Sequence, residues 1–136
     1  MRRGEPTLST EFEAIFAALR AILRKHAGRL TVKEDSASCF CLEGGLHPKH
    51  RKPMPIAWVT IGKAYVSYHL MAVYVCPNLL DKHSEKLKRR MQGKSCFNFK
   101  VRDEGLFAEL EQLTAEGFEA FRRGGFWGKD RKAESP

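Results

Sequence analysis

The first third of the chain carries an apolar stripe at helical spacing. The stripe begins at Phe12 and ends at Leu23, and its members recur every three or four positions. Thr10 and Glu13 have the spacing of a capping box, in which each side chain satisfies an N–H group at the start of a helix. Gly28 is a typical C-terminal stop. The pattern predicts an amphipathic helix that starts at Thr10 and ends before Gly28.

A second apolar stripe lies toward the other end of the chain. It runs from Leu106 to Phe121, with Asp103 before it as N-cap and Gly124 after it as a stop. The sequence therefore predicts a last helix over residues 103–124. A shorter, irregular helix is predicted to be capped by Ser84 and to end at Gly93.

Between these helices, apolar and polar residues alternate with the period of two that is typical of strands. Gly44 and Gly45 are predicted to end the second strand, and the proline-rich basic residues 46–55 are predicted to form a loop. In the last strand, Phe97, Phe99 and Val101 share one face. The predicted strands lie around residues 30–32, 39–43, 56–61, 64–75 and 94–101.

Gly62 and Lys63 separate two of these strands and suit a two-residue type II′ hairpin turn. Such a turn pairs Ile61 with Ala64, and residues that pair across the hairpin share a face. The predicted core face carries Ala57, Val59, Ile61, Val66, Tyr68 and Leu70. The predicted open face carries Trp58, Thr60, Tyr65, Ser67, His69 and Met71.

Together the elements predict an α+β fold. Its simplest form is a single, mostly antiparallel sheet of about five strands with the helices packed on one face, because this arrangement buries every apolar stripe. The 136 residues fit a single domain over 1–136. Residues 1–8 are predicted to be a loose N-terminal arm and residues 126–136 a loose C-terminal tail.

The composition is that of an ordinary globular protein, with 43% hydrophobic and 29% charged residues. No apolar run approaches the roughly 20 residues that a membrane helix needs. The charged N-terminal start lacks the apolar stretch of a signal peptide. We therefore expect a cytoplasmic protein with no membrane partner.

Positive charge is concentrated in the middle of the chain. The formal net charge is +8, and residues 63–102 hold nine Lys and Arg against two Asp and Glu. Such asymmetry favours an anionic partner, with nucleic acid as the foremost candidate, because basic side chains that contact phosphates release counterions. A solvated lysine-rich surface is the alternative interpretation. The candidate anion-binding residues are Lys86, Lys88, Arg89, Arg90 and Lys94.

The open face offers a second candidate binding surface. Trp58, Tyr65 and His69 are predicted to lie on it, and aromatic rings flanked by basic residues bind single-stranded nucleic acids. The same rings would also serve as packing residues or as anchors of a homo-oligomer or another protein interface.

Metal binding and enzymatic chemistry receive weaker support. Cys39, Cys41, His47 and His50 are four soft ligands within a short stretch, but their spacing is unusual for zinc. Cys96 with a histidine would make a nucleophile and base only if the fold brought them together. The sequence predicts a non-enzymatic protein with no cofactor.

The C-terminal half resembles the YdhG-like family of uncharacterised domains. The resemblance lies in residues 63–71, in residues 87–100 and in residues 106–117, and the run Gly-Lys-Ser-Cys-Phe-Asn-Phe at 93–99 is its most specific part. That family is grouped with the frataxin-like and YjbR-like domains. The resemblance implies an α+β fold with helices against one face of an antiparallel sheet.

The resemblance implies less about function. Frataxins handle iron through an acidic ridge on their first helix and first strand, whereas the first helix here has only Glu11 and Glu13 and carries arginines as well. YjbR-like domains have been proposed to bind DNA, which the charge would permit. Three functions therefore stay open: binding of an anionic partner such as nucleic acid, protein–protein or self-association, and binding of iron or zinc.

Overall fold

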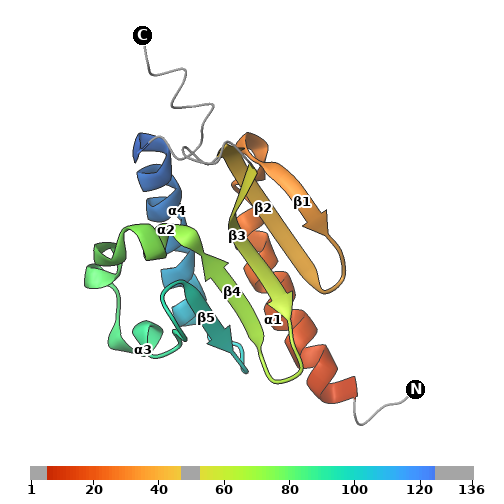
Figure 1. Cartoon of the computed structure of the whole chain (residues 1–136). Helices are drawn as coiled ribbons and strands as arrows, with labels where there is room; N and C mark the ends of the chain where they lie inside the picture. Colours follow the sequence, from red (N-terminus) through yellow and green to blue (C-terminus); the bar gives the residue numbers. More distant parts are fainter. Residues whose placement is uncertain (1–5, 47–52, 125–136) are drawn as a thin grey trace.

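Five antiparallel strands and two long helices form the frame of the molecule (Figure 1). The computed structural model describes residues 6–46 and 53–124. In chain order the elements are α1 (Pro6–Arg24), η1 (Ala27–Arg29), β1 (Thr31–Asp35), β2 (Cys39–Leu46), β3 (Pro53–Ile61), β4 (Val66–Leu70), α2 (Met71–Val75), η2 (Pro77–Lys82), α3 (Glu85–Lys88), β5 (Cys96–Phe99) and α4 (Glu104–Gly124).

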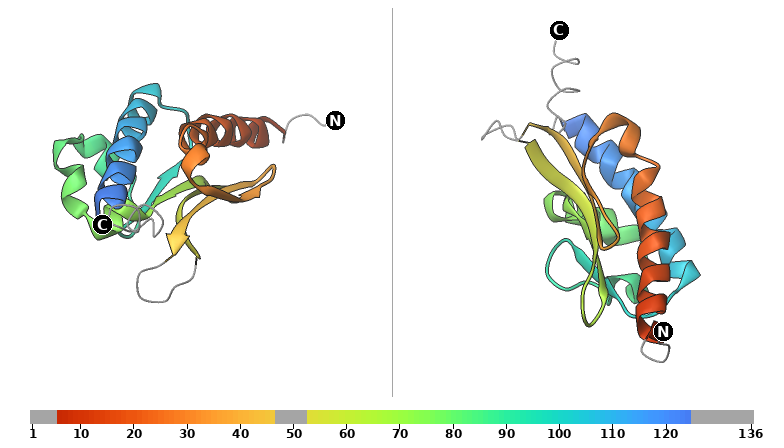
Figure 2. Two further views of the ribbon diagram at one scale, coloured as in Figure 1. Left: turned by 90° about the horizontal axis from the view of Figure 1, so that it is seen from above. Right: turned by 90° about the vertical axis from the view of Figure 1, so that its right-hand side faces the viewer.

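The sheet is a simple meander with the strand order β1-β2-β3-β4-β5. Each strand pairs antiparallel with the one before it. Figure 2 shows α1 and α4 side by side on one face of this sheet, while the opposite face carries no helix among the described residues. The predicted α+β fold is confirmed.

The core lies between the sheet and the two long helices. The predicted stripe of α1 is buried from Phe12 to Leu23, and that of α4 is buried from Leu106 to Phe121. Asp103 caps α4 as predicted, because its Oδ1 accepts a hydrogen bond of 3.0 Å from the backbone N–H of Leu106. No helix within residues 6–46 and 53–124 has the length and apolar character to cross a membrane.

The first helix differs from its predicted bounds at both ends. It begins at Pro6, so Thr10 lies inside it and residues 6–8 belong to a helix rather than to a loose arm. A proline suits the first helical position, because its missing N–H would have no partner there. The helix ends at Arg24, and Gly28 lies in the short 3-10 helix that follows.

The β3–β4 hairpin has the predicted faces but not the predicted register. Ile61 pairs with Val66 rather than Ala64, and Trp58 pairs with His69 rather than Ser67. The loop therefore has four residues, 62–65, and Gly62 donates its N–H to the carbonyl of Tyr65 at 2.9 Å. Because the register moves by two positions, every side chain keeps its face.

Several predicted strand limits are wrong. Residues 71–75 form α2, because Ala72 and Val73 are buried where the chain turns onto α4. Gly44 and Gly45 lie inside β2, next to an irregularity in its pairing with β3. Val101 is 60% exposed beyond the end of β5. Of the residues predicted to form a loop over 46–55, Leu46 belongs to β2 and residues 53–55 belong to β3.

Gly117 of α4 is expected to resist substitution by alanine. A Cβ at this position would lie 2.7 Å from the Cβ of Ala72, which has no flexible side chain to move. Overpacking of this kind costs roughly 1–3 kcal/mol, more than the gain of about 1 kcal/mol in helix propensity. Gly105→Ala is the matched control, because its new Cβ would meet only Asp103 Oδ1 at 3.5 Å. Urea unfolding should show a loss of stability for Gly117→Ala alone.

Tyr68 and Thr114 form a buried hydrogen-bonded pair between β4 and α4, and both side chains are fully buried. Thr114→Val should cost about 1–3 kcal/mol, because it leaves the Tyr68 hydroxyl without a partner. The double variant with Thr114→Val and Tyr68→Phe should be more stable than Thr114→Val alone, because it removes the unpaired hydroxyl. Strict additivity of the two substitutions in chemical denaturation would show that the two hydroxyls are not coupled.

Candidate anion-binding site

The basic cluster predicted from the sequence lies on and after the short helix α3. Ser84 caps this helix as predicted, since its Oγ accepts a hydrogen bond of 3.1 Å from the N–H of Leu87. Leu87 is fully buried and fixes one side of the helix against the core. The exposed side carries Lys86, whose Nζ lies 3.0 Å from Asp103 Oδ2, and Lys88, whose Nζ lies 3.5 Å from Glu85 Oε2.

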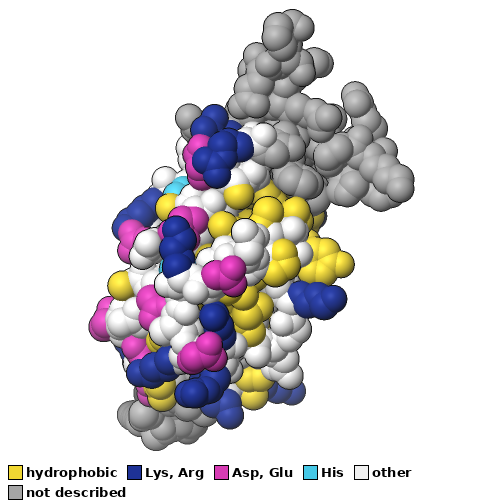
Figure 3. Space-filling model, turned by 90° about the vertical axis from the view of Figure 1, so that its left-hand side faces the viewer, with side chains coloured by type: hydrophobic (Ala, Val, Ile, Leu, Met, Phe, Trp, Pro, Cys, Tyr) yellow, Lys and Arg dark blue, Asp and Glu magenta, His cyan; other side chains and the backbone are white. Residues whose placement is uncertain are grey.

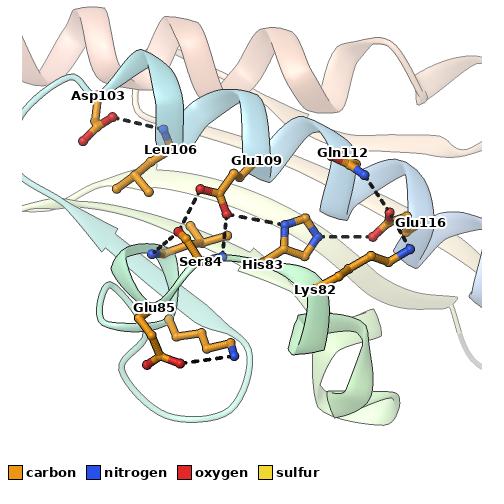
Figure 4. Close-up of polar contacts among 11 residues, drawn as sticks. Lys82, His83, Ser84, Glu85, Asp103, Leu106, Glu109, Gln112 and Glu116 are labelled. Atoms are coloured by element: carbon orange, nitrogen blue, oxygen red, sulfur yellow. Dashed lines mark hydrogen bonds and ion pairs between the residues drawn. The ribbon is translucent and has the colours of Figure 1, made fainter.

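A polar cluster docks this segment onto α4 (Figure 4). The His83 side chain is only 3% exposed, and its two ring nitrogens lie 3.5 Å from Glu109 and 3.2 Å from Glu116. Glu109 also accepts hydrogen bonds from Ser84, 2.9 Å from the backbone N–H and 2.8 Å from Oγ. Lys82 Nζ lies 3.2 Å from Glu116. Two carboxylates that lie about two turns apart on α4 thus hold three consecutive residues, Lys82, His83 and Ser84.

These contacts favour the ionised carboxylates. The hydrogen bond from the backbone N–H of Ser84 is the main cause that lowers the pKa of Glu109. Burial opposes ionisation of Glu116, but the hydrogen bonds from His83 and Lys82 outweigh it and lower the pKa of that residue. Both carboxylates of the docking cluster are therefore ionised at neutral pH.

After α3 the chain continues along the outer edge of β5. The carbonyl of Arg90 accepts a hydrogen bond of 2.9 Å from the N–H of Asn98, and Gln92 donates its N–H to the carbonyl of Cys96 at 2.9 Å. Met91 bridges to Phe97 between these two bonds. Gly93, with a φ of +86°, supplies the left-handed conformation in the turn that leads into β5.

This path brings Arg89 and Arg90 opposite the β3–β4 loop, with a solvent-accessible hollow of about 420 Å³ between them. No lining residue is acidic, and three of them, Arg89, Arg90 and Lys100, are basic. The hollow is lined by Ala64, Tyr65, Arg89, Arg90, Met91, Gln92, Asn98 and Lys100. It joins one predicted aromatic residue to two predicted basic residues.

The other two predicted aromatic residues lie together on the open face. The rings of Trp58 and His69 are stacked, with centroids 4.5 Å apart and an angle of 15° between their planes. Burial lowers the pKa of His69, which favours the neutral imidazole. Tyr65 does not belong to this stack, because it lies in the β3–β4 loop beside the hollow.

A chain of polar contacts connects the stack to the hollow. His69 Nε2 lies 3.5 Å from Cys96 Sγ, which lies 3.3 Å from Asn98 Oδ1. Ser67 Oγ donates to the same Asn98 oxygen at 2.8 Å, and Asn98 Nδ2 donates to Gln92 Oε1 at 2.6 Å. The fold therefore does bring Cys96 and a histidine together. Burial raises the pKa of the Cys96 thiol, however, and a protonated thiol is a poor nucleophile.

The remaining candidates from the sequence contribute little to this site. Lys94 is exposed in the turn before β5 and does not line the hollow. Cys39 and Cys41 lie on β2, and burial is the main cause that raises the pKa of both thiols, that of Cys39 to about 11. His47 and His50 lie outside the described residues, within which no group of three or more His, Cys, Asp or Glu side chains could hold a metal.

Sequence reasoning missed the hollow and the docking cluster. Lys100 and Asn98 alternate with Phe97 and Phe99, so the pattern that buries the phenylalanines already places these two polar residues on the opposite face. No signal in the sequence joins Gln92 to Asn98, because their contact depends on the edge pairing beside β5.

Comparisons of the chain with protein-family models, with curated proteins and with solved structures found no match. The resemblance to YdhG-like domains thus stays a prediction.

The docking cluster should make the free energy of unfolding depend on pH in the acidic range. Because the pKa of Glu109 is lowered, its carboxylate contributes stability above the unfolded glutamate pKa of about 4.3, and this contribution is lost as the pH falls through the folded pKa. Glu109→Gln should therefore cost roughly 1–2 kcal/mol at neutral pH and progressively less below about pH 4. Denaturant unfolding across this pH range measures both.

Glu13→Gln is the control, because it removes an exposed carboxylate from α1 that has no hydrogen bond or ion pair within residues 6–46 and 53–124. A stability difference between wild type and Glu109→Gln that is independent of pH would contradict the assigned role of the carboxylate.

Proposed function

We propose that this protein binds single-stranded nucleic acid through the hollow and the open face of the sheet. The observation that carries the proposal is the convergence of Arg89, Arg90 and Lys100 on a hollow whose lining contains no carboxylate. Phosphate groups are the natural partners of such a donor-rich surface.

The distribution of ion pairs supports this location. Four basic residues of the 63–102 segment lie within 4 Å of a carboxylate: Lys82, Lys86, Lys88 and Arg102. Five others have no ion-pair partner within the described parts of the chain: Lys63, Arg89, Arg90, Lys94 and Lys100. Figure 3 shows the mixture of basic and acidic side chains on the left-hand side of the molecule of Figure 1. Three of these five residues, Arg89, Arg90 and Lys100, line the hollow, so much of the positive charge that lacks a described partner converges there.

The aromatic residues favour a single strand over a duplex. Unpaired bases stack on aromatic side chains, whereas the bases of a duplex already stack on each other. Trp58 and His69 are half-buried on the sheet face that carries no helix within residues 6–46 and 53–124, and Tyr65 is half-buried beside the basic residues. A strand whose phosphates meet the arginines would meet Tyr65 in the lining, and the contacts from Asn98 through Cys96 to His69 lead from the hollow to the stacked rings.

Neutralising the two arginines should weaken binding and its dependence on salt. We expect Arg89→Gln combined with Arg90→Gln to flatten the plot of log affinity against log salt by about 1.4, since each phosphate contact to a single strand contributes about 0.7. Fluorescence anisotropy of a labelled single-stranded oligonucleotide, titrated between roughly 50 and 200 mM salt, measures the slope.

Lys25→Gln combined with Lys82→Gln is the matched control. It removes the same two charges at residues whose side chains are 59% and 65% exposed and paired with α4 carboxylates away from the hollow. Equal loss of binding in both double variants would mean that net charge alone attracts the strand. Wild-type protein that binds no oligonucleotide even at low salt would refute the proposed function.

A further inference from the structure

The hollow offers hydrogen-bond donors in excess of what one internal phosphodiester can use. Arg89 and Arg90 each present a guanidinium with five N–H donors, and Lys100 presents an ammonium with three. An internal phosphodiester carries one charge and two free oxygens. A phosphate monoester carries a charge of about −1.5 to −2 and three acceptor oxygens.

The amide groups in the lining add donors rather than acceptors. The Oδ1 of Asn98 accepts from Ser67 and Cys96, and the Oε1 of Gln92 accepts from Asn98. The Nε2 of Gln92 makes no hydrogen bond within residues 6–46 and 53–124. Each amide oxygen thus already accepts a hydrogen bond inside the protein, and the N–H₂ group of Gln92 is left for a ligand.

The size of the hollow matches a single small group. Its volume of about 420 Å³ lies toward the lower end of the range for small-molecule sites, roughly 300–1,000 Å³. One wall is the β3–β4 loop with Tyr65, and the other is the chain that runs beside β5. The phenol ring of Tyr65 offers a surface on which the base or sugar next to the phosphate can pack.

We propose that the hollow binds a phosphate monoester attached to a nucleoside, and that it takes this group from the phosphorylated end of a single strand. The inference rests on the proposed function and adds to it the part of the strand that is recognised. A free nucleoside monophosphate presents the same chemistry, and the experiment separates the two sources.

The test compares three oligonucleotides of one sequence and roughly 12 nucleotides, a length within the site sizes of single-strand binding folds. One has a 5′ phosphate, one a 3′ phosphate and one hydroxyls at both ends. At least one phosphorylated form should bind about tenfold more tightly than the unmodified form, because a monoester adds charge-assisted hydrogen bonds. Lys100→Gln should reduce this preference, whereas Lys94→Gln, an exposed lysine outside the hollow, should preserve it.

The outcomes distinguish the end-recognition inference from the proposed function. Equal affinity for all three oligonucleotides would overturn the end-recognition inference and leave the proposed function standing. Binding of a nucleoside monophosphate without binding of any oligonucleotide would support the monoester site but refute the nucleic-acid function. Absence of binding to every probe would refute both. If the nucleoside monophosphate displaces the phosphorylated oligonucleotide at equal concentration, the free nucleotide rather than the strand end is the ligand.

Discussion

Both long helices lie on the same face of the sheet, so β2 to β5 bury side chains on that face and leave the alternate set with no helix over it among the described residues, whereas β1 is exposed along its whole length. The uncovered set forms two rows that cross the sheet through paired positions. One row is Cys41, Trp58, His69 and Cys96, and the other is Cys39, Thr60, Ser67 and Asn98. Their side chains partly bury one another by stacking and hydrogen bonding. One-sided burial is thus the origin of the aromatic face.

A second consequence concerns the segment between β4 and β5, which contains α2, η2 and α3. After α2, this segment contributes only Leu87 to the buried hydrophobic core, and Leu79, Leu80 and Met91 pack against that core while partly buried. Its polar anchors are Lys82, His83 and Ser84, which meet carboxylates of α4. The acidic side chains of α4 therefore neutralise the basic residues nearest to them. Arg89, Arg90 and Lys100 lie beyond this reach, and within residues 6–46 and 53–124 no ion pair compensates their charge.

The sequence predicts the features that depend on contacts between near neighbours in the chain, or on the alternation of odd and even strand positions between the two faces of the sheet. The caps at Ser84 and Asp103 were predictable because each side chain bonds to a backbone N–H three residues away. The faces of β3 and β4 survive a wrong turn assignment because a shift of two positions preserves parity. By contrast, α2 forms because Ala72 packs against α4 at Gly117, a contact distant in sequence. The hollow likewise depends on edge pairing beyond β5 and on a loop that pattern alone made too short.

The cations that line the hollow bear on function because, within the described residues, they lack the ion pairs that stabilise other basic residues of the same segment. Like charges that lie close together repel each other, and ion pairs with Asp103 and Glu85 already relieve Lys86 and Lys88 of this repulsion. Among the residues that line the hollow no carboxylate supplies the same relief, and each amide oxygen of the lining already accepts an internal hydrogen bond. An anion that enters the hollow would meet Arg89, Arg90 and Lys100 and would remove the repulsion among them. The same side chains that cost the free protein electrostatic energy would therefore give a phosphate ligand its affinity.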